Sequence, residues 1–242
     1  MNMGQIFVMP PDWIPDPLII TNFRRAFTIL PFGRYFLNTL TIVIPAVAGT
    51  VISSSISAYS FARLRWRGRS LVFAVIMSTL MLPFAVTLIP TFLGWRYIVG
   101  LNSYLPLIVP AWFGGGAFNI FLMRQFMLGI PRELEESAHI DGASYAQILS
   151  RIILPLSKSA MIVIGLFAFF RTWNEFLGPL IYLSDSRMYT LALGLSQFIG
   201  EYSAEWNLLM AASAVVVMPP VILFFFGQKF LMEGISLTGM KG

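Results

Sequence analysis

The chain has 242 residues, of which 57% are hydrophobic and 11% charged, and its formal net charge is +5. This composition lies far from the balance of a soluble domain and indicates a membrane protein. The sequence has no cysteine and a single histidine, His139, which excludes disulfides, thiolate metal sites and multi-histidine metal sites. The basic residues are grouped, which favours orientation in a bilayer over nucleic-acid binding. We therefore expect an all-α polytopic membrane protein without metal or cofactor.

Long apolar runs predict five transmembrane helices, because a span needs about 20 residues. The residues before and between them are proline-rich or polar. The spans are expected at about 35–61, 70–92, 104–123, from about 159 onward, and 207–226.

Two segments are expected outside the bilayer. Residues 1–34 carry four prolines between Pro10 and Pro17, which predicts an irregular extracytoplasmic segment. Residues 178–206 are too polar to face lipid throughout, so they predict an extracytoplasmic loop that could be partly re-entrant. One membrane domain would then cover 35–242.

The first span has a broad face of small residues. Small side chains let a neighbouring helix approach closely. The face predicts helix packing, with a polar translocation path as the alternative. Its residues are Ala46, Thr50, Ser54 and Ala58, four positions apart, with Gly49, Ser53 and Ser57 beside them.

Prolines and glycines interrupt the second and third spans. Pro83 and Pro90 lie in the second, which we expect to be kinked or broken near its outer half, with a loop over 94–103. The third contains three consecutive glycines at 114–116. They predict either tight packing or a flexible gate.

A polar segment lies between two apolar runs, over residues 131–155, and predicts a compact helical elbow. Pro131 suits the first position of a helix. Glu133, Glu135 and Glu136 would then lie in its first turn, where the helix dipole favours acids.

The second half of this elbow carries its own helix signals. Gly142 can adopt the left-handed conformation that ends the first helix. Ser144 and Gln147 have the spacing of a capping box, so a second helix should begin at once. Pro155 would interrupt that helix before the next span.

The elbow also carries a motif by which the chain resembles a known family. The spacing E-A-A-x3-G-x9-I-x-L-P is met by Glu136-Ser137-Ala138, Gly142, Ile152 and Leu154-Pro155, and only Ser137 departs from it. This EAA motif resembles that of the permease subunits of bacterial ABC importers. The extended form is similar to the carbohydrate-uptake branch typified by the second permease of the maltose transporter. Weaker matches lie at 173–176 and 234–242.

The resemblance implies a permease subunit of the bacterial inner membrane, part of a translocation path for a carbohydrate and not itself an enzyme. It implies three partners, namely a cytoplasmic ATPase dimer, a second permease and an extracytoplasmic solute-binding protein. The elbow would be the coupling helix, with Glu136 paired to a base of the ATPase and Gly142 as hinge. The residues assigned to ATPase coupling are Glu135, Glu136, Ser137, Ala138, Asp141, Gly142, Ile152, Leu154 and Pro155.

Four residues of the fourth span are candidates for the substrate path. Arg171 and Glu175 are expected at membrane depth, where ionisable residues default to a functional role. Because opposite charges four positions apart can satisfy each other, a structural pair is equally open. Trp173 and Asn174 would suit a sugar, since an amide binds hydroxyls and an aromatic face covers C–H surface. An interfacial position for Trp173 is the alternative.

The positive charges predict the orientation. Of the 16 Lys and Arg residues, ten lie in segments expected to be cytoplasmic, including the loop over 63–69 and the elbow. Five spans would place the N-terminus outside and the C-terminus in the cytoplasm. Permeases of this family usually have six spans, so a further apolar helix is expected upstream of Met1.

Other function classes stay open from the residues alone. The sequence has no phosphate-binding loop and no hydrolase motif, so energy must come from a partner or an ion gradient. An ion-coupled secondary transporter or channel subunit would favour midplane charges and inverted repeats, and neither is clear. A structural membrane subunit would leave the elbow unexplained.

Overall fold

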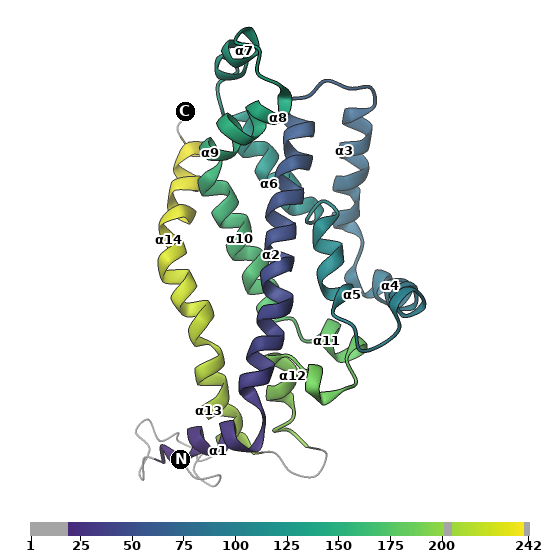
Figure 1. The fold of residues 1–242 in the computed structure, drawn as a ribbon, viewed down its shortest axis with the longest axis vertical. Helices are drawn as coiled ribbons and strands as arrows, with labels where there is room; N and C mark the ends of the chain where they lie inside the picture. The colour runs from purple at the N-terminus through teal and green to yellow at the C-terminus, as the bar shows by residue number, and fades with distance from the viewer. Residues whose placement is uncertain (1–18, 201–204, 240–242) are drawn as a thin grey trace.

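The protein is an elongated bundle of helices in a computed structural model that describes residues 19–200 and 205–239 (Figure 1). These residues contain no β-strand. Three helices are long and apolar enough to cross a membrane, and the number rises to five if each of two bent pairs is one span. The prediction of an all-α protein is confirmed, and that of five spans is confirmed when each bent pair is counted as one span. The three single spans are Phe32–Ala62, Leu105–Leu128 and Trp206–Leu231.

Helix α2 (Phe32–Ala62) is the central element of the bundle (Figure 1). Its 31 residues give a length of about 46 Å, enough to cross the hydrocarbon core of a bilayer. It packs against α6 (Ala117–Leu128), α10 (Lys158–Trp173) and the short helix η3 (Val109–Trp112). The small-residue face makes the last of these contacts, because the Oγ of Ser53 donates a hydrogen bond to the carbonyl of Ala111 at 2.9 Å. Helix packing is thus confirmed for part of the face, whereas Ala46 and Thr50 line a cavity, so the translocation path stays a prediction.

The second span is broken. Helix α3 (Arg69–Ser78) continues into η2 (Thr79–Met81), and α4 (Phe84–Val99) leaves it at 103°. The break lies at Pro83, as predicted. The predicted loop over 94–103 is wrong in its first part, because α4 continues to Val99 through Pro90 and the chain turns only at Gly100, with φ +76°.

The third span is interrupted at its glycines. Helix α5 (Leu105–Ile108) and η3 precede the triplet, and α6 follows it. Gly114, Gly115 and Gly116 all have positive φ, which residues with a Cβ rarely adopt. A Cβ on Gly115 would lie 2.6 Å from the carbonyl oxygen of Thr50 in α2. Close packing therefore requires this glycine.

The N-terminal prediction is partly wrong. The four prolines between Pro10 and Pro17 lie outside the described residues, but Thr21–Ile29 forms helix α1, which packs on α13. The first span begins at Phe32, three residues earlier than expected.

The remaining helices form the elbow, the connection after α10 and the last span. The predicted polar stretch 178–206 contains short helices among its described residues. The bounds are α7 Glu133–Ile140, α8 Tyr145–Ile148, the π-helix η4 Leu149–Ile153, α9 Leu154–Leu156, α11 Leu177–Tyr182, η5 Ser186–Met188, α12 Leu191–Ser196, α13 Trp206–Val216 and α14 Met218–Gly239.

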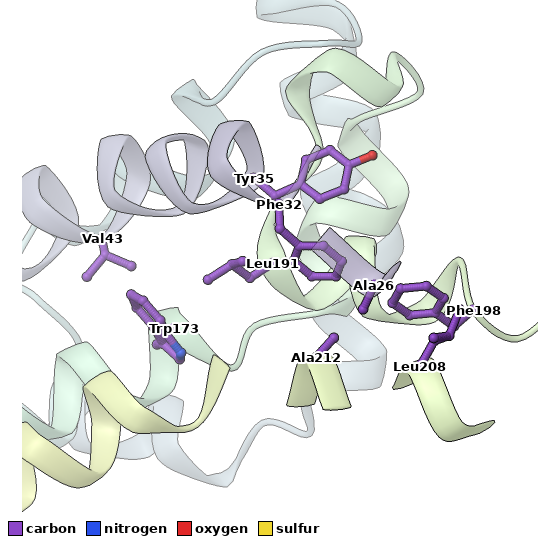
Figure 2. Close-up of a cluster of buried hydrophobic side chains, with 9 residues drawn as sticks. All are labelled: Ala26, Phe32, Tyr35, Val43, Trp173, Leu191, Phe198, Leu208 and Ala212. Atoms are coloured by element: carbon purple, nitrogen blue, oxygen red, sulfur yellow. The ribbon is translucent and has the colours of Figure 1, made fainter. Parts of the chain in front are cut away.

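Two hydrophobic clusters lie toward opposite ends of α2. The aromatic cluster, drawn in Figure 2, lies toward α1 and α12. The elbow cluster lies toward α7 and α8. The aromatic cluster comprises Ala26, Phe32, Tyr35, Val43, Trp173, Leu191, Phe198, Leu208 and Ala212, and the elbow cluster Ala58, Tyr59, Ala62, Met123, Met127, Ile148, Ile153, Ala160 and Ile164.

Candidate functional site

The first helix of the elbow, α7, begins at Glu133 with Arg132 as its N-cap. Pro131 therefore lies before the helix, and its predicted place at the first helical position is corrected. The three acids do lie in the first turn. Gly142 has φ +80°, and its N–H donates to the carbonyl of His139 at 3.0 Å. The left-handed helix end is confirmed.

The second half of the elbow begins with the predicted capping box. The backbone N–H of Ser144 donates to Oε1 of Gln147 at 2.8 Å, and the N–H of Gln147 donates to Oγ of Ser144 at 3.4 Å. Pro155 does not end the helix, which corrects the prediction. The chain passes through η4 and α9, and the 77° bend into α10 falls at Ser157.

The coupling residues divide into packed and exposed groups. Ala138, Ile152 and Leu154 pack partly against the elbow cluster. Glu136, Ser137, Asp141, Gly142 and Pro155 are exposed. The hydroxyl of Ser137 donates to the carbonyl of Leu134 at 3.2 Å, so serine meets its own hydrogen-bonding need where the motif has alanine.

Glu135 is the exception among the acids. Its Oε1 lies 3.0 Å from Nε of Arg63, and the two side chains are only 12% and 3% exposed. Among the described residues, Glu135 is thus engaged within this chain, while Glu136 on the same helix faces solvent.

A cavity of about 540 Å³ lies beside α2. Helices α4, α5, α6, α10 and α11 contribute to its wall together with α2. The polar side chains of the wall are Thr39, Thr50, Thr91, Asn119, Arg171, Thr172, Glu175, Tyr182 and Thr190.

Arg171 and Glu175 both line this cavity. They form no ion pair, and none of the described residues makes an ion pair with Arg171. Glu175 lies beyond the end of α10, and its Oε1 accepts the backbone N–H of Gly178 at 2.9 Å. Of the two open interpretations, the structural pair is wrong and cavity lining is supported.

Trp173 and Asn174 do not belong to the cavity wall. Trp173 is 3% exposed within the aromatic cluster, and its Nε1–H donates to the carbonyl of Val216 at 3.2 Å (Figure 2). Its assignment to the path is corrected, and so is the interfacial alternative, because the side chain is buried in protein. The amide of Asn174 donates to the carbonyl of Phe170 at 2.8 Å.

Sequence reasoning missed several polar residues of the wall. Asn119 follows the glycine triplet, and its Nδ2 donates to the carbonyl of Gly115 at 2.7 Å. Thr39 accepts the N–H of Leu191 at 2.9 Å, so it joins α2 to α12. The amide side chain within an apolar span is a sequence signal that could have identified Asn119. No such signal in the sequence marks Thr39.

A bundle of bent membrane helices around a cavity, with a polar helical elbow at one end, defines the membrane subunit of a transporter. The family model of the binding-protein-dependent transport system inner membrane component matches residues 49–236. The chain is 29% identical to the sulfoquinovosyl glycerol transport system permease protein SmoH of Agrobacterium fabrum, over 99% of this chain and 84% of that one. It is 32% identical to the arabinooligosaccharides transport system permease protein AraQ of Halalkalibacterium halodurans, over 94% and 81%.

The fold agrees with these sequence relatives. A bacterial ABC transporter involved in the import of the acidic polysaccharide alginate superposes with a TM-score of 0.78 at 24% identity, covering 90% of this chain and 80% of that one. The chain belongs to the family of binding-protein-dependent transport system inner membrane components. It is a permease subunit of an ABC importer, which contributes to a translocation path and is coupled to a separate ATPase. Such subunits are not enzymes themselves, and an ion-coupled transporter is not supported.

Proposed function

We propose that this permease imports a carbohydrate through the cavity beside α2, and that residues 131–155 receive the ATPase. The observation that carries the proposal is the composition of the cavity wall. Hydroxyls, the amide of Asn119 and the charges of Arg171 and Glu175 lie among apolar and aromatic side chains. Polar groups of these types bind sugar hydroxyls, and apolar surfaces cover sugar C–H groups.

The names of the relatives support the same substrate class. SmoH and AraQ are named for a sulfoquinovosyl glycerol and for arabinooligosaccharides. Both are carbohydrates or their glycosides, which favours a sugar for this chain as well.

The elbow has the surface expected of an ATPase contact. Ile140 is 87% exposed and Tyr145 58%, and both belong to the same elbow as the exposed acid Glu136. Exposed apolar residues beside a free carboxylate are typical of a surface that a protein partner covers. Glu136 is the acid that would pair with a base of the ATPase.

The orientation and the second permease follow from this assignment. If the elbow faces the cytoplasm, α14 ends on that side too (Figure 1), which supports a cytoplasmic C-terminus. The helices α3 and α4 have no buried residues. Their apolar faces are available to a second permease subunit, with which this chain would share the path.

Purification of the detergent-solubilised importer tests the ATPase contact. The permease is co-expressed with its ATPase, second permease and solute-binding protein. We expect Glu136→Gln to lose ATPase during purification, while Asp185→Asn, at the opposite end, retains it. Full retention by Glu136→Gln would contradict the contact.

Transport by the reconstituted importer tests the cavity. Asn119→Leu keeps a similar volume and removes the amide. We expect it to raise the KM for the sugar while ATPase retention stays unchanged. An unchanged KM for every carbohydrate carried by the wild type would contradict the proposed path.

A further inference from the structure

Three elements meet at the side chain of Arg63. The residue follows the last turn of α2, and its backbone N–H donates to the carbonyl of Tyr59 at 2.9 Å. Its Nη2 donates to the carbonyls of Met127 and Ile130, the second at 2.6 Å. Its Nε lies 3.0 Å from Oε1 of Glu135 in α7. One guanidinium thus joins the end of α2, the end of α6 and the first helix of the elbow.

The loop that carries Arg63 contains three further arginines, and none of them has this arrangement. Arg65 and Arg67 are exposed. Arg69 donates to the carbonyl of Leu64 within the same loop, at 2.8 Å. A charge cluster that only fixes membrane orientation needs no buried member, because the positive-inside effect depends on side and not on contacts. Arg63 therefore has a second role.

Helix α7 depends on this contact more than the rest of the elbow does. None of its eight residues is buried. The second half of the elbow, in contrast, is held by Ile148 and Ile153, which are fully buried in the elbow cluster. Without the ion pair, α7 would remain attached to the bundle through the partial packing of Ala138 and through the chain itself.

We infer that Arg63 and Glu135 are a positioning pair that makes α7 follow the membrane helices α2 and α6 as one body. A displacement of α7 would reach both helices through the guanidinium, and a displacement of the helices would reach α7. Removal of the pair would leave the ATPase bound but let α7 move without the spans. The inference rests on the proposed ATPase contact of residues 131–155.

The carbonyl contacts of Arg63 make Glu135 the better site for the test. In Glu135→Gln, the guanidinium keeps both carbonyl acceptors, which stabilise a cation at a helix end. An exchange of the two charges would instead place a carboxylate against these carbonyls. The isosteric amide removes the ion pair with the least disturbance of the fold, and gel filtration in detergent checks assembly.

The experiment compares Glu135→Gln with Glu136→Gln in the reconstituted importer, with transported sugar per hydrolysed ATP as the readout. We expect Glu135→Gln to retain its ATPase and to carry about tenfold less sugar per ATP, the size typical of strongly coupled neighbouring side chains. Arg63→Gln combined with Glu135→Gln should lower the ratio no further than the stronger single variant. Additive losses, or an unchanged ratio in Glu135→Gln, would overturn the inference.

A distance measurement provides a readout that does not depend on activity. The chain has no cysteine, so spin labels can be placed at Arg67→Cys and Arg132→Cys, both of which are exposed. We expect a narrow distance distribution in the wild-type background and a broader one with Glu135→Gln. An unchanged distribution overturns the inference. Loss of ATPase from Glu135→Gln overturns it too, whereas ATPase retention by Glu136→Gln counts only against the proposed contact.

Discussion

The two ends of the bundle are built from different side chains. At the aromatic cluster, the rings of Phe32 and Phe198 stack at 5.9 Å and those of Phe169 and Trp173 at 5.2 Å. Hydrogen bonds between uncharged groups join distant segments of the chain at this end. The amide of Asn38, for example, donates to the carbonyls of Arg187 and Tyr189, both at 2.9 Å.

At the other end, the buried cluster has mostly smaller side chains, and apolar residues are exposed on the surface. Alanine, methionine and isoleucine fill the elbow cluster, and a buried ion pair holds α7. Exposed apolar residues and a free acid remain on the elbow. The difference indicates that rings and hydrogen bonds between uncharged groups hold one end together, while a buried ion pair positions α7 at the other.

The largest effect is expected for Gly142→Pro at the hinge of the elbow. Gly142 has φ +80° and donates its N–H to His139, whereas proline has φ near −65° and no N–H. We expect near-complete loss of ATP hydrolysis stimulated by the solute-binding protein, with normal membrane insertion. Gly142→Ala should lose less of this stimulated ATP hydrolysis. Normal coupling in Gly142→Pro would remove the elbow from the mechanism.

Cavity-creating substitutions at the two ends sharpen the comparison. Phe32→Ala and Ile148→Ala each truncate a side chain that is at most 1% exposed, and such changes cost about 2–5 kcal/mol. We expect both to lower the thermal unfolding temperature in detergent. Below that temperature, only Ile148→Ala should reduce sugar transported per ATP. Equal uncoupling by both variants would show that the ends do not differ in function.

Alanine substitutions at two glycines allow the cost of a steric clash to be measured apart from the general effect of replacing a glycine. A Cβ on Gly115 would lie 2.6 Å from a backbone oxygen, at φ +65°, and one on Gly94 would have no neighbour within 4 Å. Gly115→Ala should destabilise by about 1–3 kcal/mol. Gly94→Ala, within α4, should stabilise by about 0.5–1 kcal/mol. Thermal unfolding of both variants measures the difference, and equal shifts would contradict the close approach of Gly115 to Thr50 in α2.

The smallest effect is expected for the ion pair of Asp185 and Arg187, at the end of the aromatic cluster. The hydrogen bonds of Arg187 lower the pKa of Asp185 from its usual value. The small contribution of the pair to the free energy of unfolding is therefore present above the unfolded-state pKa of Asp185. It is lost as the pH falls through the folded-state pKa. Because the pair is open to solvent, Asp185→Asn should leave the unfolding temperature near neutral pH unchanged. A clear drop would mean that this surface is covered in the assembled importer.

Local signals predicted the elbow well. The acids of its first turn, the left-handed Gly142 and the capping box depend on residues within a few positions of one another, so sequence spacing is sufficient to identify them. The end of α9 was not predicted, because π-helical turns precede Pro155 and the bend falls at Ser157.

The cavity was harder to predict, because it depends on contacts between distant segments. From their spacing, a helical pair and a cavity lining were equally open for Arg171 and Glu175, and only the end of α10 at Trp173 separates the two residues. The burial of Trp173 depends on α13, whose Val216 accepts its hydrogen bond. The ion pair of Arg63 and Glu135 joins residues 72 positions apart, and neither spacing nor composition reveals it.

The central claim is that the elbow faces the ATPase in the cytoplasm, and thiol labelling tests it most directly. Ile140→Cys and Ser186→Cys each introduce one exposed cysteine into a chain that has none. The first lies on the elbow and the second at the opposite end. In intact spheroplasts, a membrane-impermeant maleimide should label Ser186→Cys alone. In inside-out vesicles from which the ATPase has been stripped, it should label Ile140→Cys alone. Labelling of Ile140→Cys from outside would contradict the account.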